Sequence, residues 1–165
     1  MVNSWHVSVA AESITAFLFA RIGYDVSVQY GANQPEYDLM VSKEDIIIKV
    51  SVKGSRDGGW GLTQGFKNKE VNYHEAINLW LNKHSNKTIF SLVQLKDVPI
   101  NELPRVYLAT PADIADLMKR ARNGAGDTVL RENKVWSKAQ YTADAIPKGW
   151  IFSEQRIHEV LANLK

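Results

Sequence analysis

The chain has 165 residues, of which 45% are apolar and 23% charged, and its formal net charge is +2. This length and composition are typical of one globular domain with enough apolar side chains for a sizeable core. There is no cysteine, which excludes a disulfide framework and a thiolate metal site, and no uncharged run is long enough to span a membrane. A net charge this small does not indicate nucleic-acid binding by itself, so such binding would need a local basic cluster. The first residues lack the basic start and apolar stretch of a signal peptide, and we expect a cytoplasmic protein without a membrane partner.

A helix is predicted over residues 7–22, where apolar residues recur at helical spacing and Gly23 follows as a C-terminal stop. Glu12 lies near its start. On the residues alone, Glu12 is a solvated acid favoured by the helix dipole. Strict alternation over residues 24–30 then predicts a strand, and residues 31–35 are predicted to form a loop.

Two further strands over residues 37–53 form a predicted hairpin with a polar turn between them. Both alternate with the period of a half-buried strand, and the second is rich in β-branched residues. Asp38 falls on the polar face of the first strand, and Ser51 and Lys53 fall on that of the second. Because paired strands share their faces, a carboxylate, a hydroxyl and an ammonium can reach a common site.

In these residues and in the order of its elements, the chain resembles the PD-(D/E)xK nuclease superfamily, whose fold is called restriction-endonuclease-like. Asp38 matches the first acid of the family motif, Lys53 its lysine, and Glu12 the acid of the preceding helix. Ser51 stands where the family has Asp or Glu, and Pro35 lies three residues before the first acid instead of directly before it. The resemblance covers residues 10–95.

The resemblance implies an α/β fold with a mixed central sheet flanked by helices, and a metal-dependent nuclease that hydrolyses phosphodiester bonds in nucleic acid, with DNA favoured. Asp38, Glu12 and the carbonyl of Val52 would bind Mg²⁺ or Mn²⁺, hard cations that prefer oxygen ligands. Lys53 would orient the attacking water and balance charge in the transition state. Ser51 would complete the catalytic set with a hydroxyl, which binds Mg²⁺ more weakly than a carboxylate.

Two alternatives stay open at this point. The first is a non-catalytic relative that binds nucleic acid or a protein partner with the same fold. The second is a small protein-interaction domain in which Lys49, Ser51 and Lys53 are the solvated face of a sheet. The sequence also leaves open whether the chain forms a homodimer.

The glycine-dense residues 54–65 are predicted to be a mobile loop beside this site. Neither phosphate-loop pattern is present, so a flexible connection is the simplest interpretation. As a nucleic-acid interface, this region would offer donors, a stacking surface and two nearby lysines. The residues concerned are Arg56, Trp60, Gln64, Lys67 and Lys69.

The later elements are a helix over residues 71–83, strands over 88–95 and 105–109, a helix over 110–122 and a last helix over 154–164. The helix over 71–83 would connect neighbouring strands by a crossover. Thr110, Pro111 and Asp113 form a helix-start signal, and Ser153 caps the last helix. Residues 127–150 have no assignment beyond a strand at 128–130. We expect one domain over 1–165, with a core of about 7–122 and a C-terminal elaboration of about 123–165.

Overall fold

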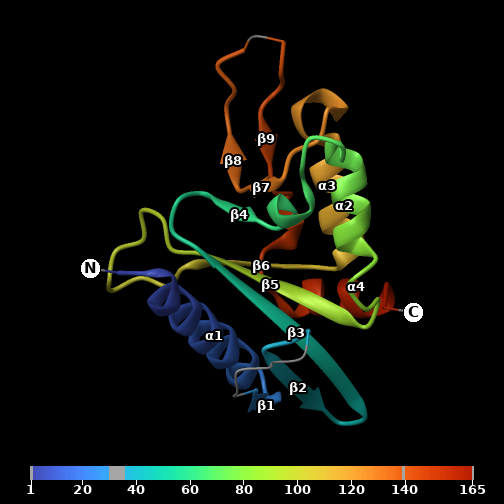
Figure 1. Ribbon diagram of the computed structural model, residues 1–165. Coiled ribbons are helices and arrows are strands. Elements are labelled where there is room, and N and C mark those ends of the chain that lie inside the picture. The colour runs from blue at the N-terminus through green and yellow to red at the C-terminus, as the bar shows by residue number, and fades with distance from the viewer. Residues whose placement is uncertain (1, 30–35, 139, 165) are drawn as a thin grey trace.

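The computed structural model describes residues 2–29, 36–138 and 140–164. Tyr30 and the loop predicted over residues 31–35 lie outside these ranges. Figure 1 shows a central sheet between two layers of helices, with a two-stranded ribbon projecting at the top. No helix in the described ranges is long and apolar enough to cross a membrane.

Five strands form the central sheet, in the order β1-β2-β3-β5-β6. They are β1 (Asp25–Val28), β2 (Leu39–Lys43), β3 (Ile46–Ser55), β5 (Thr88–Gln94) and β6 (Arg105–Ala109). All neighbours pair antiparallel except β3 and β5, which are parallel. In the β2–β3 hairpin, Leu39 lies opposite Val50 and Val41 opposite Ile48. The predicted mixed sheet and its hairpin are therefore confirmed.

In the part of the chain that the structure describes, four α-helices cover the sheet, and each begins with a side-chain cap. They are α1 (Ser4–Arg21), α2 (Tyr73–Leu81), α3 (Pro111–Gly124) and α4 (Glu154–Ala162). At α3, the Thr110 hydroxyl accepts from the Asp113 N–H at 3.1 Å, and the Asp113 carboxylate accepts from the Thr110 N–H at 3.1 Å. The Ser153 hydroxyl accepts from the Arg156 N–H at 3.0 Å and starts α4. Apart from a short additional strand between β3 and α2, the predicted order of helix, three strands, helix and strand is confirmed.

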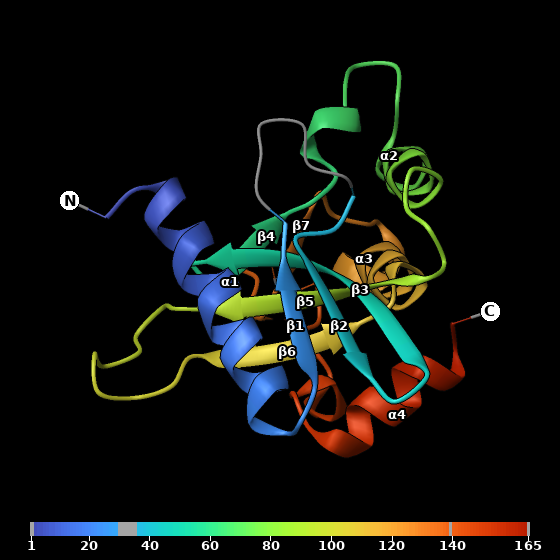
Figure 2. The ribbon, with the colours of Figure 1, turned by 90° about the horizontal axis from the view of Figure 1, so that it is seen from below.

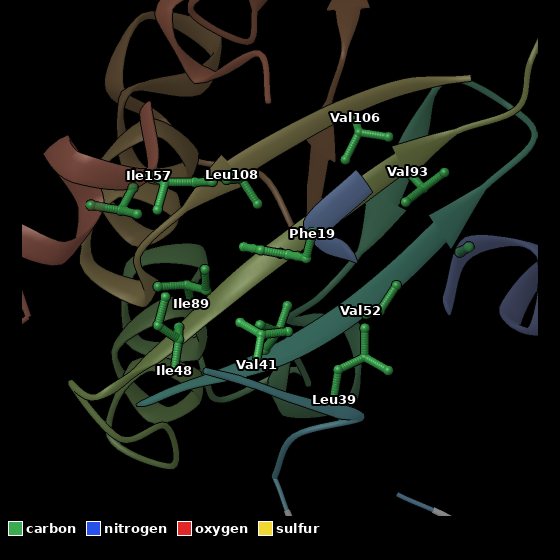
Figure 3. Packing of buried hydrophobic residues seen from close by; sticks show 13 residues of the cluster. Phe19, Leu39, Val41, Ile48, Val52, Ile89, Val93, Val106, Leu108 and Ile157 are labelled. Carbon is green, nitrogen blue, oxygen red and sulfur yellow. The ribbon is translucent and has the colours of Figure 1, made fainter. Parts of the chain in front are cut away.

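The sheet separates two hydrophobic cores. The core under α1 and α4 is shown in Figure 3, where Phe19 and Ile157 lie over side chains of the sheet such as Leu39 and Ile89. The core under α2 and α3 contains Trp80 and its neighbours from β5 and β6. Because side chains alternate along a strand, β5 supplies both cores, with Ile89 and Val93 in the first and Phe90 and Leu92 in the second. Burying one large aliphatic or aromatic side chain contributes about 1.5–3 kcal/mol.

The segment after β3 departs from the prediction of a mobile loop over residues 54–65. β3 continues to Ser55, and then come a short strand β4 (Gly59–Gly61) and a 3₁₀ turn η1 (Gln64–Phe66). Trp60 fixes this path, because its ring is 3% exposed and its indole N–H donates to the Lys53 carbonyl at 2.9 Å. β4 pairs antiparallel with β7 (Val129–Arg131), where Trp60 lies opposite Leu130. The predicted loop is thus mostly ordered structure.

The region without a sequence assignment forms the projecting ribbon of Figure 1. Its strands are β8 (Asn133–Lys134) and β9 (Asp144–Ala145), and a 3₁₀ turn η2 (Lys148–Trp150) follows. Asp144 ties the ribbon to the body, since its carboxylate accepts from the Arg122 N–H at the end of α3 and from the Trp136 indole N–H at 2.7 Å.

Candidate active site

A groove of about 770 Å³ lies where the N-terminal half of α1 meets the end of β3. Figure 2 shows the arrowheads of β3 and β5 directed toward α1, with β4 behind them. Side chains of Glu12, Asp38 and Lys53 all line this groove, together with residues of β4. Three predicted site residues from three different elements are therefore brought together.

Asp38 is held by backbone hydrogen bonds at the start of β2. Its N–H donates to the Val50 carbonyl at 2.9 Å, and its carbonyl accepts from the Gln29 N–H at 2.9 Å. Its carboxylate oxygen Oδ2 accepts from the Val52 N–H at 2.6 Å. The ammonium nitrogen of Lys53 lies 3.8 Å from the same oxygen. The predicted meeting of the Asp38 carboxylate with the Lys53 ammonium is confirmed.

Glu12 reaches the groove from the opposite wall, α1. Partial burial raises the pKa of the Glu12 carboxyl above its usual value, Asp38 raises it further, and Lys53 lowers it. Glu12 and Asp38 are thus close enough to repel each other when both are ionised. Two carboxylates that share a partly desolvated groove are favoured in their charged forms when a cation lies near both.

Helix α1 can approach β3 this closely because Gly54 has no side chain. A Cβ at Gly54 would lie 2.7 Å from Val7 Cγ1, 2.9 Å from the Val7 carbonyl oxygen and 3.1 Å from Ala11 Cβ. Gly54 directly follows Lys53, and Ala11 directly precedes Glu12. The contact that packs the helix on the strand therefore also fixes the position of Glu12 relative to Lys53.

Ser51 is the predicted catalytic residue that does not line the groove. It is 1% exposed and lies beside Phe90 in the parallel pairing of β3 with β5. Phe90 belongs to the core under α2, so this face of β3 is covered at Ser51, whereas Lys53 two residues later lines the groove. Val52, the predicted carbonyl ligand, does line the groove.

Of the residues predicted to bind nucleic acid, Arg56 is exposed and lines the groove. Trp60 also borders the groove, but its ring is 3% exposed. The interpretation of Trp60 as a stacking surface is corrected, because both the core and the Lys53 carbonyl hold its indole in place. The other three residues lie beyond β4 and do not line the groove: Gln64, Lys67 and Lys69.

Trp5 and Ser8 are among the groove residues of α1 that were not singled out from the sequence. Trp5 is 66% exposed. Residues five, eight and twelve are spaced so that they lie along one side of a helix. The spacing from Glu12 could have indicated both residues, provided that Glu12 was already assigned to the site.

The oxygen donors of the groove fit a hard divalent cation. Within the described residues there is no group of three or more His, Cys, Asp or Glu side chains that could hold a metal ion. Asp38 and Glu12 supply two carboxylates, and Val52, which also lines the groove, would add its carbonyl oxygen. Mg²⁺ usually retains several waters and is bound by one or two carboxylates together with substrate phosphates. The donor set therefore suits Mg²⁺ or Mn²⁺ when a phosphate ligand is present.

The element order and the mixed sheet flanked by helices are those of the α/β fold predicted from the sequence. No family model matches the chain. A UPF0102 protein of Prochlorococcus marinus strain MIT 9303 is 30% identical over 105 residues, which cover 58% of this chain and 83% of that protein. The UPF0102 protein of strain MIT 9313 matches to the same extent. The chain belongs to the UPF0102 family.

Among solved structures, that of the bacterial homing endonuclease I-Ssp6803I aligns with a TM-score of 0.46 and 16% identity, over 99% of this chain and 95% of that one.

Proposed function

We propose that the chain is a metal-dependent nuclease that hydrolyses phosphodiester bonds in nucleic acid, with DNA as the favoured polymer. The observation that carries this proposal is the convergence of Glu12, Asp38 and Lys53 on one groove. These residues come from α1, the start of β2 and the end of β3. Packing alone does not require ionisable groups at this point, because the apolar faces of the same elements already form the core under α1.

Asp38 and Glu12, with the carbonyl of Val52, would hold Mg²⁺ or Mn²⁺. A bound ion of this kind neutralises phosphate charge and lowers the pKa of a coordinated water. The Val52 N–H orients the Asp38 carboxylate by its 2.6 Å hydrogen bond. Lys53 places an ammonium beside that carboxylate, where it can donate to a phosphate oxygen or to the attacking water and offset developing negative charge.

The raised pKa of Glu12 gives this groove a pH dependence. A cation competes with a proton for the Glu12 carboxylate, so metal affinity rises with pH until that group is ionised. Cleavage should therefore increase as the pH rises through the pKa of Glu12. Replacement by Gln should weaken metal binding and remove the pH dependence contributed by this residue.

Cleavage of labelled DNA in Mg²⁺ or Mn²⁺ tests the proposal. Asp38→Asn, Lys53→Met and Glu12→Gln should each lower the rate by about 10²-fold or more. Asp116→Asn is a matched control, since that carboxylate lies on the outer surface of α3 with 67% of its side chain exposed. Two results would overturn the proposal. One is cleavage at the wild-type rate by all three groove variants, and the other is wild-type cleavage that does not need a divalent ion.

A non-catalytic nucleic-acid-binding relative is the second candidate, and Ser51 is the observation that favours it. Ser51 has a hydroxyl where the PD-(D/E)xK superfamily has an acid. This residue is buried beside Phe90 and does not line the groove. Salt-dependent DNA binding by a wild type that cuts nothing in Mg²⁺ or Mn²⁺ would identify this second function.

A further inference from the structure

We infer that Trp5 is a stacking platform for an unpaired base of single-stranded nucleic acid, at the end of the groove that contains Asp38 and Lys53. The inference rests on the proposed function in one respect, namely that this groove binds a nucleic-acid strand. The inference adds that the substrate class is single-stranded or frayed nucleic acid. It also adds that Trp5 is the residue that selects this class.

The first argument is the exposure of the indole. The ring of Trp5 is 66% exposed, whereas Trp60, Trp80 and Trp150 are between 3% and 7% exposed. A tryptophan that packs in a core contributes a large apolar area to folding, and Trp5 does not do so. Its first helical turn is nevertheless well defined, because the Asn3 side chain accepts from the His6 N–H at 3.0 Å. The exposed ring is thus presented by an ordered helix end.

The second argument is the position of Trp5 relative to the proposed catalytic residues. Trp5, Ser8 and Glu12 follow one side of α1, and all three line the groove. Seven residues of α-helix extend about 10.5 Å, and stacked nucleotides of one strand are about 3.4 Å apart. A strand whose phosphate lies between Glu12 and Lys53 would therefore place a base at Trp5 about three nucleotides away.

The third argument is the charge beside the ring. Arg56 lines the same end of the groove, and its guanidinium donates to the Val2 carbonyl, which precedes α1. Arg56 and Lys53 thus supply cations along the wall that faces Trp5. Aromatic platforms combined with a basic track are the usual means of binding single strands, because every base has a face that can stack. A base inside a duplex already has both faces covered, so an unpaired base is the ligand that this arrangement fits.

Binding of a labelled single-stranded oligonucleotide tests the inference, with every substitution made in an Asp38→Asn background to prevent cleavage. Trp5→Ala should raise Kd by about 5- to 150-fold, and Trp5→Phe should retain most of the affinity. Ile47→Ala is the matched control, because Ile47 is 67% exposed and lies six residues before Lys53 at the other end of β3. On an oligonucleotide without bases, Trp5→Ala and its parent should bind equally.

Three results would overturn the inference. One is an unchanged Kd of Trp5→Ala for the single strand. Another is a loss of affinity for a blunt duplex in Trp5→Ala that equals the loss for the single strand. The third is a wild-type dimer that dissociates in Trp5→Ala, since Val2 and Val9 are also exposed beside the ring and a second copy could cover them. Cleavage by the wild type together with an unchanged Kd in Trp5→Ala would refute only the stacking role. Binding that depends on Trp5 in a wild type that does not cut would refute only the nuclease.

Discussion

Replacing Gly54 by Ala should destabilise the protein and displace one wall of the groove. The added Cβ would lie 2.7 Å from Val7 Cγ1 and 2.9 Å from the Val7 carbonyl oxygen, whereas ordinary contact begins at 3.4 Å. Val7 is β-branched and its carbonyl belongs to the helix backbone, so neither atom can rotate away. Restoring ordinary contact requires α1 to move outward by about 0.5–0.7 Å, as the difference between these distances gives.

This overpacking should lower the free energy of unfolding by about 1–3 kcal/mol. For a chain of this size, each kcal/mol corresponds to about 2–4 °C in Tm, which gives a decrease of about 2–12 °C. Because a catalytic arrangement tolerates displacements of only about 0.5 Å, the same helix shift should also reduce cleavage, by up to about 100-fold. The loss of activity depends on the proposed function, whereas the loss of stability depends on the contact alone.

Urea unfolding and calorimetry of Gly54→Ala measure the effect, with Gly65→Ala as the matched control. No atom lies within 4 Å of a Cβ built at Gly65, and its φ is outside the left-handed region. The control should be neutral or stabilised by up to about 1 kcal/mol, because alanine restricts the unfolded chain. A Gly54→Ala protein as stable as the Gly65→Ala protein would refute the close-contact argument.

Three further predictions concern charges outside or within the groove. Glu12→Gln should raise Tm at neutral pH, because burial and a neighbouring carboxylate raise the pKa of Glu12, so that the folded state carries an unfavourable charge. This gain in Tm should disappear as the pH falls to the usual carboxyl range. A gain in Tm that does not vary with pH would contradict the prediction. Arg156→Met should lower the free energy of unfolding by about 1–3 kcal/mol, since the buried guanidinium donates to a carbonyl of β6 at 3.0 Å; an unchanged midpoint in urea would be the opposing result. The His84 imidazole should titrate by NMR below its usual pKa because of burial, and Glu36→Gln should lower that pKa further by removing the negative charge of the carboxylate whose oxygen lies 3.0 Å away; a pKa that rises in the variant would disprove the assignment.

The hairpin shows what sequence periodicity can predict. Alternation with a period of two assigns each side chain of a strand to one face, and a short polar turn fixes which residues are opposite. For this reason the meeting of Asp38 with Lys53 followed from the sequence, and the structure places the carboxylate and the ammonium 3.8 Å apart. The start of α3 was predictable in the same way, because Thr110 and Asp113 cap each other within a single turn.

Other features depend on contacts between residues far apart in the chain, which periodicity does not reveal. Trp60 reads as a loop residue among glycines, but its pairing with Leu130 places it in a strand. Ser51 was correctly assigned to the strand face of Lys53, yet packing beside Phe90 decided that its hydroxyl is covered. Trp5 lies before the helix predicted over residues 7–22, and only the folded chain shows that it belongs to α1 and is exposed at a groove.

The hydrogen bond from the Val52 N–H to Asp38 Oδ2 makes one backbone signal a direct reporter of the groove. Hydrogen bonds to ionised acceptors are shorter and stronger than those to neutral ones, so the chemical shift of that amide proton depends on the charge carried by Asp38. Protonation of Asp38, binding of a divalent cation or arrival of a phosphate should each displace the resonance. Occupancy of the groove can then be followed through this one amide in a variant with strongly reduced turnover, such as Lys53→Met.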